Sequence, residues 1–471
     1  MSTSIKEKKA EAHDEDYPDG GSLAWRQVLA GHLIQMMAGG YATAFGVYQL
    51  YYTDSLQLPS SQISWIGSVQ IFLNCIGCLI SGRLADTGYV REVVLCGSLL
   101  VLLGSVTTSF AQVYWQIFLA QGVCTGFGLG LMYSPSITVI SSYFKKKRTL
   151  AITIASTGSG TGSIIFPATV QYLMPLIGFR WAVSCAGLVV LMLAILMNLL
   201  LKPRSRPSMR TEKKCRGRLM DSNALKEAPF LLFTAGAFLL YWALYFGYFY
   251  INTYAISTIS FTPTSAVSLI LITNAAGIPI RPLIGYLADA YLGPLNTFML
   301  SCLSLALSLF FWTLVHTKTT MYVWAVFFGA CNAAAMGGFL GALASPGLNG
   351  GRNSGGDRVT GNRGEESIGE RFGLCSGIIA IATVAGPPTA GAIIDACGSF
   401  VWAQVWAGAV VLGAVAMLAM SKNLPTSSPL VLVHEATSTV DWGVGVTGEI
   451  CFITPAAYLG SPSLRSLRSS S

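Results

Sequence analysis

Long apolar stretches separated by short polar turns run through most of this chain. A helix that crosses the roughly 30 Å hydrocarbon layer of a bilayer needs about 20 mostly apolar residues. Twelve stretches between Val28 and Met420 approach or exceed that length. They predict membrane-spanning helices over residues 28–52, 63–82, 93–110, 113–139, 149–173, 180–201, 229–256, 266–288, 295–315, 321–344, 372–395 and 400–420.

Inside a bilayer every backbone N–H and C=O group must find a partner within the protein, so these segments should be helical. The pattern Gly-x-Leu-Ala-Asp occurs at 82–86 and again at 285–289, each time at the end of an apolar stretch. This repetition predicts two related halves with a substrate site between them, near the middle of the bilayer. We therefore predict an all-α membrane protein with twelve transmembrane helices in two six-helix halves.

Polar stretches divide the chain further. We expect the polar stretch near 347–369 and the C-terminal tail (422–471) to be disordered, because neither carries an apolar pattern. The predicted regions are a cytosolic tail (1–27), the first half (28–201), a cytosolic loop (202–228), the second half (229–421) with a polar insertion near 347–369, and a C-terminal tail (422–471).

Composition supports a place in lipid, since 53% of residues are hydrophobic and only 11% are charged. With the N-terminus in the cytosol, the outward loops hold only Arg180 and Lys318, whereas Arg91, the run 145–148 and a basic cluster at 202–226 face inward. Positive loops stay on the cytosolic side, so both termini are expected there. The plasma membrane is the default location, and a vacuolar or other internal membrane is the alternative.

Several other classes of protein fit poorly. The net charge of +8 comes from basic residues in the inward loops, which does not indicate nucleic-acid binding. The eleven cysteines are scattered through apolar segments and make no disulfide framework. The apolar segments hold no convergent His, Asp and Ser set and no metal-ligand cluster, so we expect no enzyme, cofactor or metal site.

Gly122, Gly126 and Gly130 follow one another at four-residue spacing in the fourth segment. Small residues at this spacing let two helix backbones approach closely in a membrane. The pattern predicts tight helix packing.

Three motifs resemble the signatures of one transporter family. Residues 18–25 read Pro-Asp-Gly-Gly-Ser-Leu-Ala-Trp, 143–151 read Tyr-Phe-Lys-Lys-Lys-Arg-Thr-Leu-Ala, and Arg-Phe-Gly at 371–373 precedes Gly-Pro-Pro-x-x-Gly at 386–391. On these motifs the chain resembles the monocarboxylate-porter family of the major facilitator superfamily, particularly its fungal members. The resemblance spans about 17–420 and implies a twelve-helix transporter that works by alternating access without hydrolysing ATP.

The signature at 82–86, followed by Arg91, also resembles the superfamily's loop between helices two and three. An acid at a helix end can pair with basic or helix-terminal groups that lock one conformation. The alternative is a solvated turn with polar ends. The candidate gating residues are Asp19, Trp25, Gly82, Asp86, Arg91, Lys145, Arg148 and Asp289.

Arg281 is the only Lys or Arg well inside a predicted segment. Placing its charge in the membrane costs about 2.5–3.5 kcal/mol or more, and such a cost usually marks function. The planar guanidinium matches a carboxylate bidentately, so we predict that Arg281 holds an anionic substrate. Pro279 and Pro282 flank it and would free backbone groups toward a cavity. The alternative is a structural ion pair with an acid on another helix.

Carboxylate transporters of the resembled family carry an arginine in helix eight that Arg281 resembles, with an aspartate one turn earlier and a lysine in helix one. Here the earlier position is Gly277, and the first segment offers only His32 as a cation. Histidine changes charge near neutral pH, which makes His32 a candidate for proton coupling. A histidine at the membrane interface is the alternative.

Segment seven carries Tyr241, Tyr245 and Tyr248 at helical spacing, with Asn252 beyond them. These residues would form an aromatic wall for a planar organic substrate, or equally an interfacial aromatic belt. Asparagines inside other segments are further candidates for binding substrate or bonding between helices. They are Asn74, Asn274 and Asn332.

Taken together, the residues predict a secondary transporter for a small organic acid or related metabolite, with protons as a candidate co-substrate. Export of a fungal secondary metabolite is the alternative within the same fold, because Gly277 and the first segment depart from the carboxylate pattern. A membrane nutrient sensor that does not transport is an alternative of another class.

Overall fold

A computed structural model describes residues 19–58, 60–204, 227–345 and 368–424. All of them belong to one compact unit, Met1–Pro429. Nearly all of the predicted insertion near 347–369, much of the 202–228 loop and most of both tails lie outside the described residues.

Helices make up nearly all of the described chain, and their order follows the predicted segments closely. The elements are α2 (Gly21–Leu56), α3 (Ser60–Asp86), α4 (Val90–Phe110), α5 (Tyr114–Ile117), η1 (Phe118–Thr125), α6 (Gly126–Tyr143), α7 (Arg148–Leu200), α9 (Ala228–Ile259), α10 (Pro263–Leu287), η3 (Ala288–Leu292), α11 (Pro294–Phe311), η4 (Trp312–Leu314), α12 (Lys318–Leu343), α14 (Ile368–Cys397) and α15 (Phe400–Asn423).

The described residues contain ten helices that are long and apolar enough to cross a membrane. One of them, α7, holds two spans, because the backbone turns at Gly178, where φ is 79°. A positive φ of this size favours glycine. The 36-residue α2 is not among the ten. It carries Gln27, His32 and Gln35 among apolar residues. With α2 and the second span of α7, the ten become the twelve predicted helices, which confirms the expected fold class.

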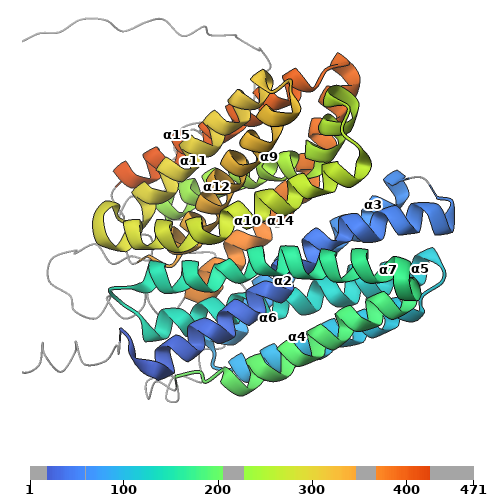
Figure 1. The fold of residues 1–471 in the computed structure, drawn as a ribbon. Coiled ribbons are helices and arrows are strands. Elements are labelled where there is room, and N and C mark those ends of the chain that lie inside the picture. Colours follow the sequence, from blue (N-terminus) through green and yellow to red (C-terminus); the bar gives the residue numbers. More distant parts are fainter. Residues whose placement is uncertain (1–18, 59, 205–226, 346–367, 425–471) are drawn as a thin grey trace, which may run out of the picture. The chain divides into compact units, whose positions relative to one another are not determined.

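The helices gather into two groups (Figure 1), α2 to α7 and α9 to α15. Within the first group α2 packs on α7 and α3 on α6, and within the second α10 packs on α12 and α9 on α15. Two long interfaces join the groups, α3 with α14 and α7 with α10. Each helix that ends in the repeated signature therefore packs against a helix of the other group.

The glycines of the fourth span make the close contacts expected of them. A side chain added at Gly122, Gly126 or Gly130 would meet a backbone carbonyl of α3, and the three carbonyls are spaced by four residues as well. They belong to Ile66, Gln70 and Asn74. A row of small residues on one helix thus lies along a row of carbonyls on the other, as predicted.

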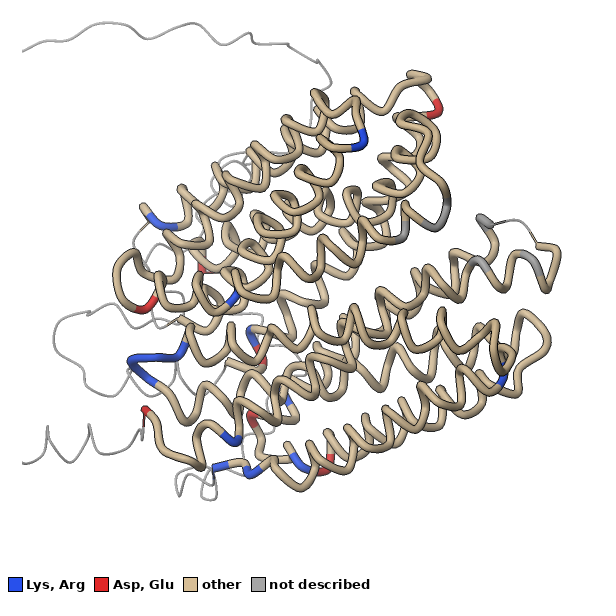
Figure 2. The backbone as a smooth tube through the Cα atoms, in the orientation of Figure 1, with Lys and Arg blue, Asp and Glu red and all other residues tan. Residues whose placement is uncertain are grey.

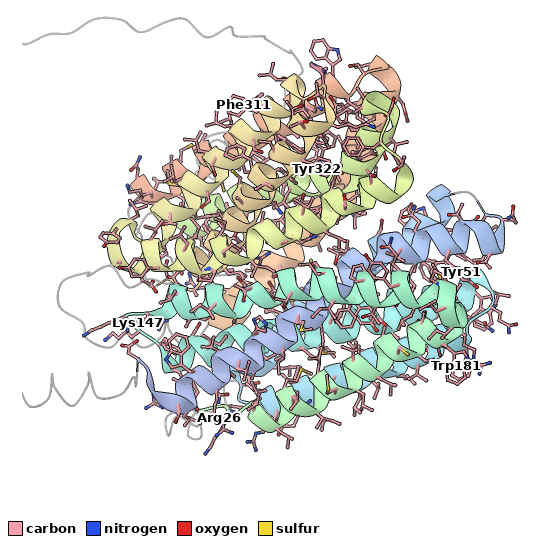
Figure 3. The ribbon with its side chains drawn as sticks, viewed as in Figure 1. Arg26, Tyr51, Lys147, Trp181, Phe311 and Tyr322 are labelled. Carbon is pink, nitrogen blue, oxygen red and sulfur yellow. The ribbon has the colours of Figure 1, made fainter. Side chains whose placement is uncertain are left out.

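Charged residues gather mainly at the helix ends (Figure 2), and the long apolar stretches between them carry few. In the first group Arg26 and Lys147 lie at one end, and Tyr51 and Trp181 lie at the other (Figure 3). Such a distribution suits helices whose middles lie in hydrocarbon.

Candidate functional site

A central cavity of about 120 Å³ lies between the two groups of helices. Both groups contribute to its wall, which combines polar, aromatic and thiol side chains. Its lining includes Gln35, Gly39, Asn74, Cys75, Cys78, Tyr133 and Ser159 from the first group, and Tyr241, Tyr245, Arg281, Met336, Phe339, Phe372 and Ser376 from the second.

Arg281 reaches this cavity from α10, and only 6% of its surface is exposed. One terminal nitrogen donates to the Ser156 carbonyl of α7 at 2.9 Å, and the other lies 3.5 Å from the Ser159 hydroxyl. Its Nε has no hydrogen-bond partner. No carboxylate of the described residues pairs with it, so the structural ion pair considered as an alternative is not found in this conformation. The guanidinium therefore has no counter-ion among the described residues.

The predicted aromatic wall is split by the structure. Tyr241 and Tyr245 line the cavity, and their contact with substrate stays a prediction. Tyr248 instead accepts a hydrogen bond from Asn332 at 2.9 Å and packs edge-on against Phe328. Its contacts lie inside the second group of helices.

Two asparagines proposed for binding also lie off the lining of this cavity. Asn274 donates to the Ile270 carbonyl of its own helix at 2.9 Å. Asn252 is half-buried on α9, and its side-chain oxygen has no partner. Asn74, by contrast, lines the cavity.

Sequence reasoning missed Gln35 and Tyr133 as cavity residues. Gln35 is 1% exposed, and neither its amide nitrogen nor its amide oxygen makes a well-formed hydrogen bond, although the Tyr133 hydroxyl lies close enough to interact with the amide. Tyr133 comes from α6 and lies next to the same amide. The signal was an uncharged polar side chain in the middle of an apolar span, which a search for charge overlooks.

His32 lies one turn before Gln35 on α2 and joins α2 to α7. Its Nδ1 is 3.1 Å from the Thr157 hydroxyl, and its Nε2 is 3.5 Å from the Thr161 hydroxyl. The ring is half-buried and does not line the central cavity. These contacts explain its position through helix packing, and its suggested proton role stays a prediction.

Asp86, the last residue of the first signature, caps the beginning of α14 in the other group. Its two carboxylate oxygens accept the backbone N–H groups of Gly369 at 3.1 Å and Glu370 at 2.6 Å. The first N–H groups of a helix lack partners within the helix and carry partial positive charge, which suits a carboxylate. Gly82, one turn earlier, lies directly against the Gly369 carbonyl, where a side chain would not fit.

The second signature makes the mirror contact. Asp289 accepts the N–H groups of Thr149 at 3.3 Å and Leu150 at 2.7 Å, at the beginning of α7. Gly285 packs against the same turn of α7. Each aspartate thus joins its own group to the first turn of a helix in the other. We call the region formed by Asp86, Asp289 and these two helix starts the aspartate end.

Other predicted gating residues gather near this end. Arg148 is buried and donates to the Phe144 carbonyl at 3.0 Å and, across the groups, to the Ala344 carbonyl at 3.1 Å. Ala344 terminates α12, where unpaired carbonyls favour a cation. Arg91 is exposed at the start of α4.

The motif before the first helix touches the motif before the fifth. One Asp19 carboxylate oxygen accepts the N–H groups of Lys145 at 2.6 Å and Lys146 at 2.9 Å. The Trp25 ring packs edge-on against Phe144, with centroids 5.5 Å apart. The two sequence signatures therefore form one local structure that holds the turn leading into α7.

Two groups of membrane-spanning helices, a central cavity between them and one end sealed by reciprocal contacts define a secondary transporter. The chain belongs to the Major Facilitator Superfamily, whose family model matches residues 31–352. It is thus a member of a family of membrane transporters.

Its relatives include fungal transporters of similar length. An MFS-type transporter of Gibberella zeae is 36% identical over 86% of this chain and 88% of its own. The aspyridones efflux protein of Emericella nidulans is 32% identical, with 84% and 77% covered. The fujikurins efflux protein of Gibberella fujikuroi is 30% identical, with 90% and 87% covered.

Among solved structures, the proton:xylose symporter XylE superimposes with a TM-score of 0.65 over 87% of this chain and 97% of that chain. The two sequences are only 12% identical, so this likeness shows the fold alone.

Proposed function

We propose that this transporter exports an organic anion of the secondary-metabolite class, with the acidic group of the substrate bound by Arg281. The single observation that carries the proposal is the buried guanidinium without a carboxylate partner in the central cavity. A buried charge is expensive unless it is paired, so an anionic ligand would relieve this cost. Tyr241 and Tyr245 would contact an aromatic or planar part of the same molecule.

The size of the cavity fits a substrate that enters only when the helices separate. Ligand pockets for metabolite-sized molecules usually measure about 300–1,000 Å³, and this one measures about 120 Å³. Because Asp86 and Asp289 join the two groups at the aspartate end, passage of a substrate through that end requires the groups to move apart, as alternating access implies. We further propose that the protein lies in the plasma membrane. Its aspartate end and both termini would face the cytosol, because Arg26 and Lys147 lie on that side.

Export is favoured over uptake by the relatives, two of which are named efflux proteins for aspyridones and fujikurins. Uptake of a small organic acid is the second candidate. It is supported by the monocarboxylate-porter motifs, two of which meet through Asp19 and Lys145. Proton coupling through His32 belongs to this second candidate.

The proposal predicts that cells expressing the chain release an acidic compound that matched cells without it retain. Arg281→Gln should lower that release at least about tenfold, because a hydrogen bond to a charged group contributes about 1.5–3 kcal/mol. Untargeted mass spectrometry of cells and medium measures both effects. Arg26→Gln, at an exposed helix end, is the matched control and should behave as wild type.

Equal release by Arg281→Gln, at equal amounts in the membrane, would contradict the anchoring role. Selective depletion of small acids from the medium would replace export by uptake as the working function.

A further inference from the structure

The central cavity holds more unpaired polar atoms than an anion alone would satisfy. Both amide atoms of Gln35, the side-chain oxygen of Asn74 and the Nε of Arg281 are buried and make no well-formed hydrogen bond, and the Tyr133 hydroxyl beside Gln35 can satisfy at most one of the two amide atoms at a time. Each buried polar group left unpaired costs about 1–3 kcal/mol. Such groups in a native structure call for an explanation. A carboxylate bound to Arg281 would leave the two amides unexplained.

These amides belong to the first group of helices, opposite the arginine. Gln35 lies on α2 and Asn74 on α3, whereas Arg281 lies on α10. The amides are nevertheless close to the guanidinium. Arg281 contacts Ser159, Ser159 lies against Gly39, and Gly39 follows Gln35 by four residues, about 6 Å along the helix axis. One ligand of modest length can therefore reach both.

We propose that Gln35 is a specificity-determining residue that reads a neutral amide in the substrate. This inference rests on the proposed function, in which Arg281 takes the acidic group. The Gln35 side chain offers an NH2 group as donor and a carbonyl oxygen as acceptor, and Asn74 offers a further acceptor. A substrate amide presents the complementary carbonyl and N–H. The ligand class is thus an aromatic carboxylate that also carries an amide.

The energetic reason is the asymmetry of hydrogen bonding. A site with buried donors and acceptors discriminates strongly against a ligand that lacks the matching groups, because its own groups then stay unpaired. An apolar ligand of the same shape would bury Gln35 against methylene groups. A bound water could satisfy the amide instead, and Gln35 would then contribute nothing to the choice of ligand.

Two probe anions separate these cases: hippurate, which joins a phenyl ring to a carboxylate through an amide, and 4-phenylbutyrate, which has methylene groups in its place. Binding is measured by thermal stabilisation of the full chain in lipid vesicles. Gln35→Met, which keeps the shape and removes the amide, should weaken hippurate about five- to tenfold and change 4-phenylbutyrate by less than about twofold. Gln35→Leu serves as a second variant should Gln35→Met fold poorly.

Gln70→Leu is the matched control, because Gln70 is also buried with both amide atoms unpaired but does not line the central cavity. It should leave both affinities unchanged. The amide proposal would be overturned if Gln35→Met weakened the binding of both probes equally, or of neither. The proposed function would stand in that case, provided that Arg281→Gln still abolished binding. Failure of both probes to bind the wild type in an Arg281-dependent way would instead overturn the proposed function.

Discussion

At the scale of single residues, Arg371 shows how a side chain outside the cavity supports the contacts at the aspartate end. Its guanidinium binds Glu227 through two hydrogen bonds of 2.9 and 2.7 Å, and it lies 5.3 Å from the centre of the Phe230 ring. Arg371 directly follows Gly369 and Glu370, whose N–H groups bind Asp86. The ion pair therefore anchors the turn of α14 that Asp86 caps.

We expect Arg371→Gln to lower the initial rate of transport in vesicles by about two- to fivefold. The pair is partly exposed, at 10% and 30% for its side chains, so it contributes on the order of 1 kcal/mol. Exchange of the charges, Glu227→Arg with Arg371→Glu, should recover part of the rate. Lys422→Gln, on the exposed end of α15, is the control. A charge exchange that transports no faster than either single variant would argue against a role for the Arg371–Glu227 ion pair.

At the scale of elements, close backbone contact between helices adds to the packing of buried apolar side chains. Lipid tails are as apolar as leucine, so helices in a membrane associate through close packing of small residues. The row of glycines on η1 and α6 against α3 is one such contact. It also positions Asn74, whose carbonyl meets Gly130 while its side chain lines the cavity.

We expect Gly126→Val to prevent stable folding, because a Cβ there would lie 2.6 Å from the Gln70 carbonyl oxygen on a rigid backbone. The loss should appear as aggregated protein and a lower unfolding temperature after extraction. Gly46→Val makes the control, since nothing lies within 4 Å of a Cβ at that exposed position. Normal folding of Gly126→Val would show that the interface is looser than the structure indicates.

At the scale of the whole molecule, the two signatures act as a symmetric pair. Asp86 joins α3 to α14, and Asp289 joins α10 to α7, so both contacts must break before this end opens. Carboxylates at helix starts stabilise by about 0.3–2 kcal/mol each, a range large enough to shift a two-state equilibrium yet small enough to reverse.

We expect Asp86→Asn with Asp289→Asn to shift the population about tenfold or more toward a conformation in which this end is open. Spin labels at Thr87 and Asn296, both exposed at this end, should report longer distances in the double variant. Asp395→Asn, at an exposed acid in the last turn of α14 and so at its other end, should leave the distances unchanged. Unaltered distances in the double variant would contradict the lock.

The sequence by itself determined the class of protein, the number of spans and most of their limits. The predicted stretches 93–110 and 295–315 match α4 and α11 with η4 within about three residues. Hydrocarbon thickness and the need to pair backbone groups act locally, so a one-dimensional pattern carries them. The charge of Arg281 is equally visible, because it stands inside a predicted span, where a charged side chain is costly.

Only the tertiary structure decided which polar residues share a cavity. Tyr245 faces it and Tyr248 does not, although both lie on α9 one turn apart, because helix rotation and neighbouring helices set the direction of each side chain. The partner of Asp86 lies at Gly369, in the other half of the chain. The role proposed for Gln35 also depends on the tertiary structure. Its unpaired amide is evident only when the helices around it are in place.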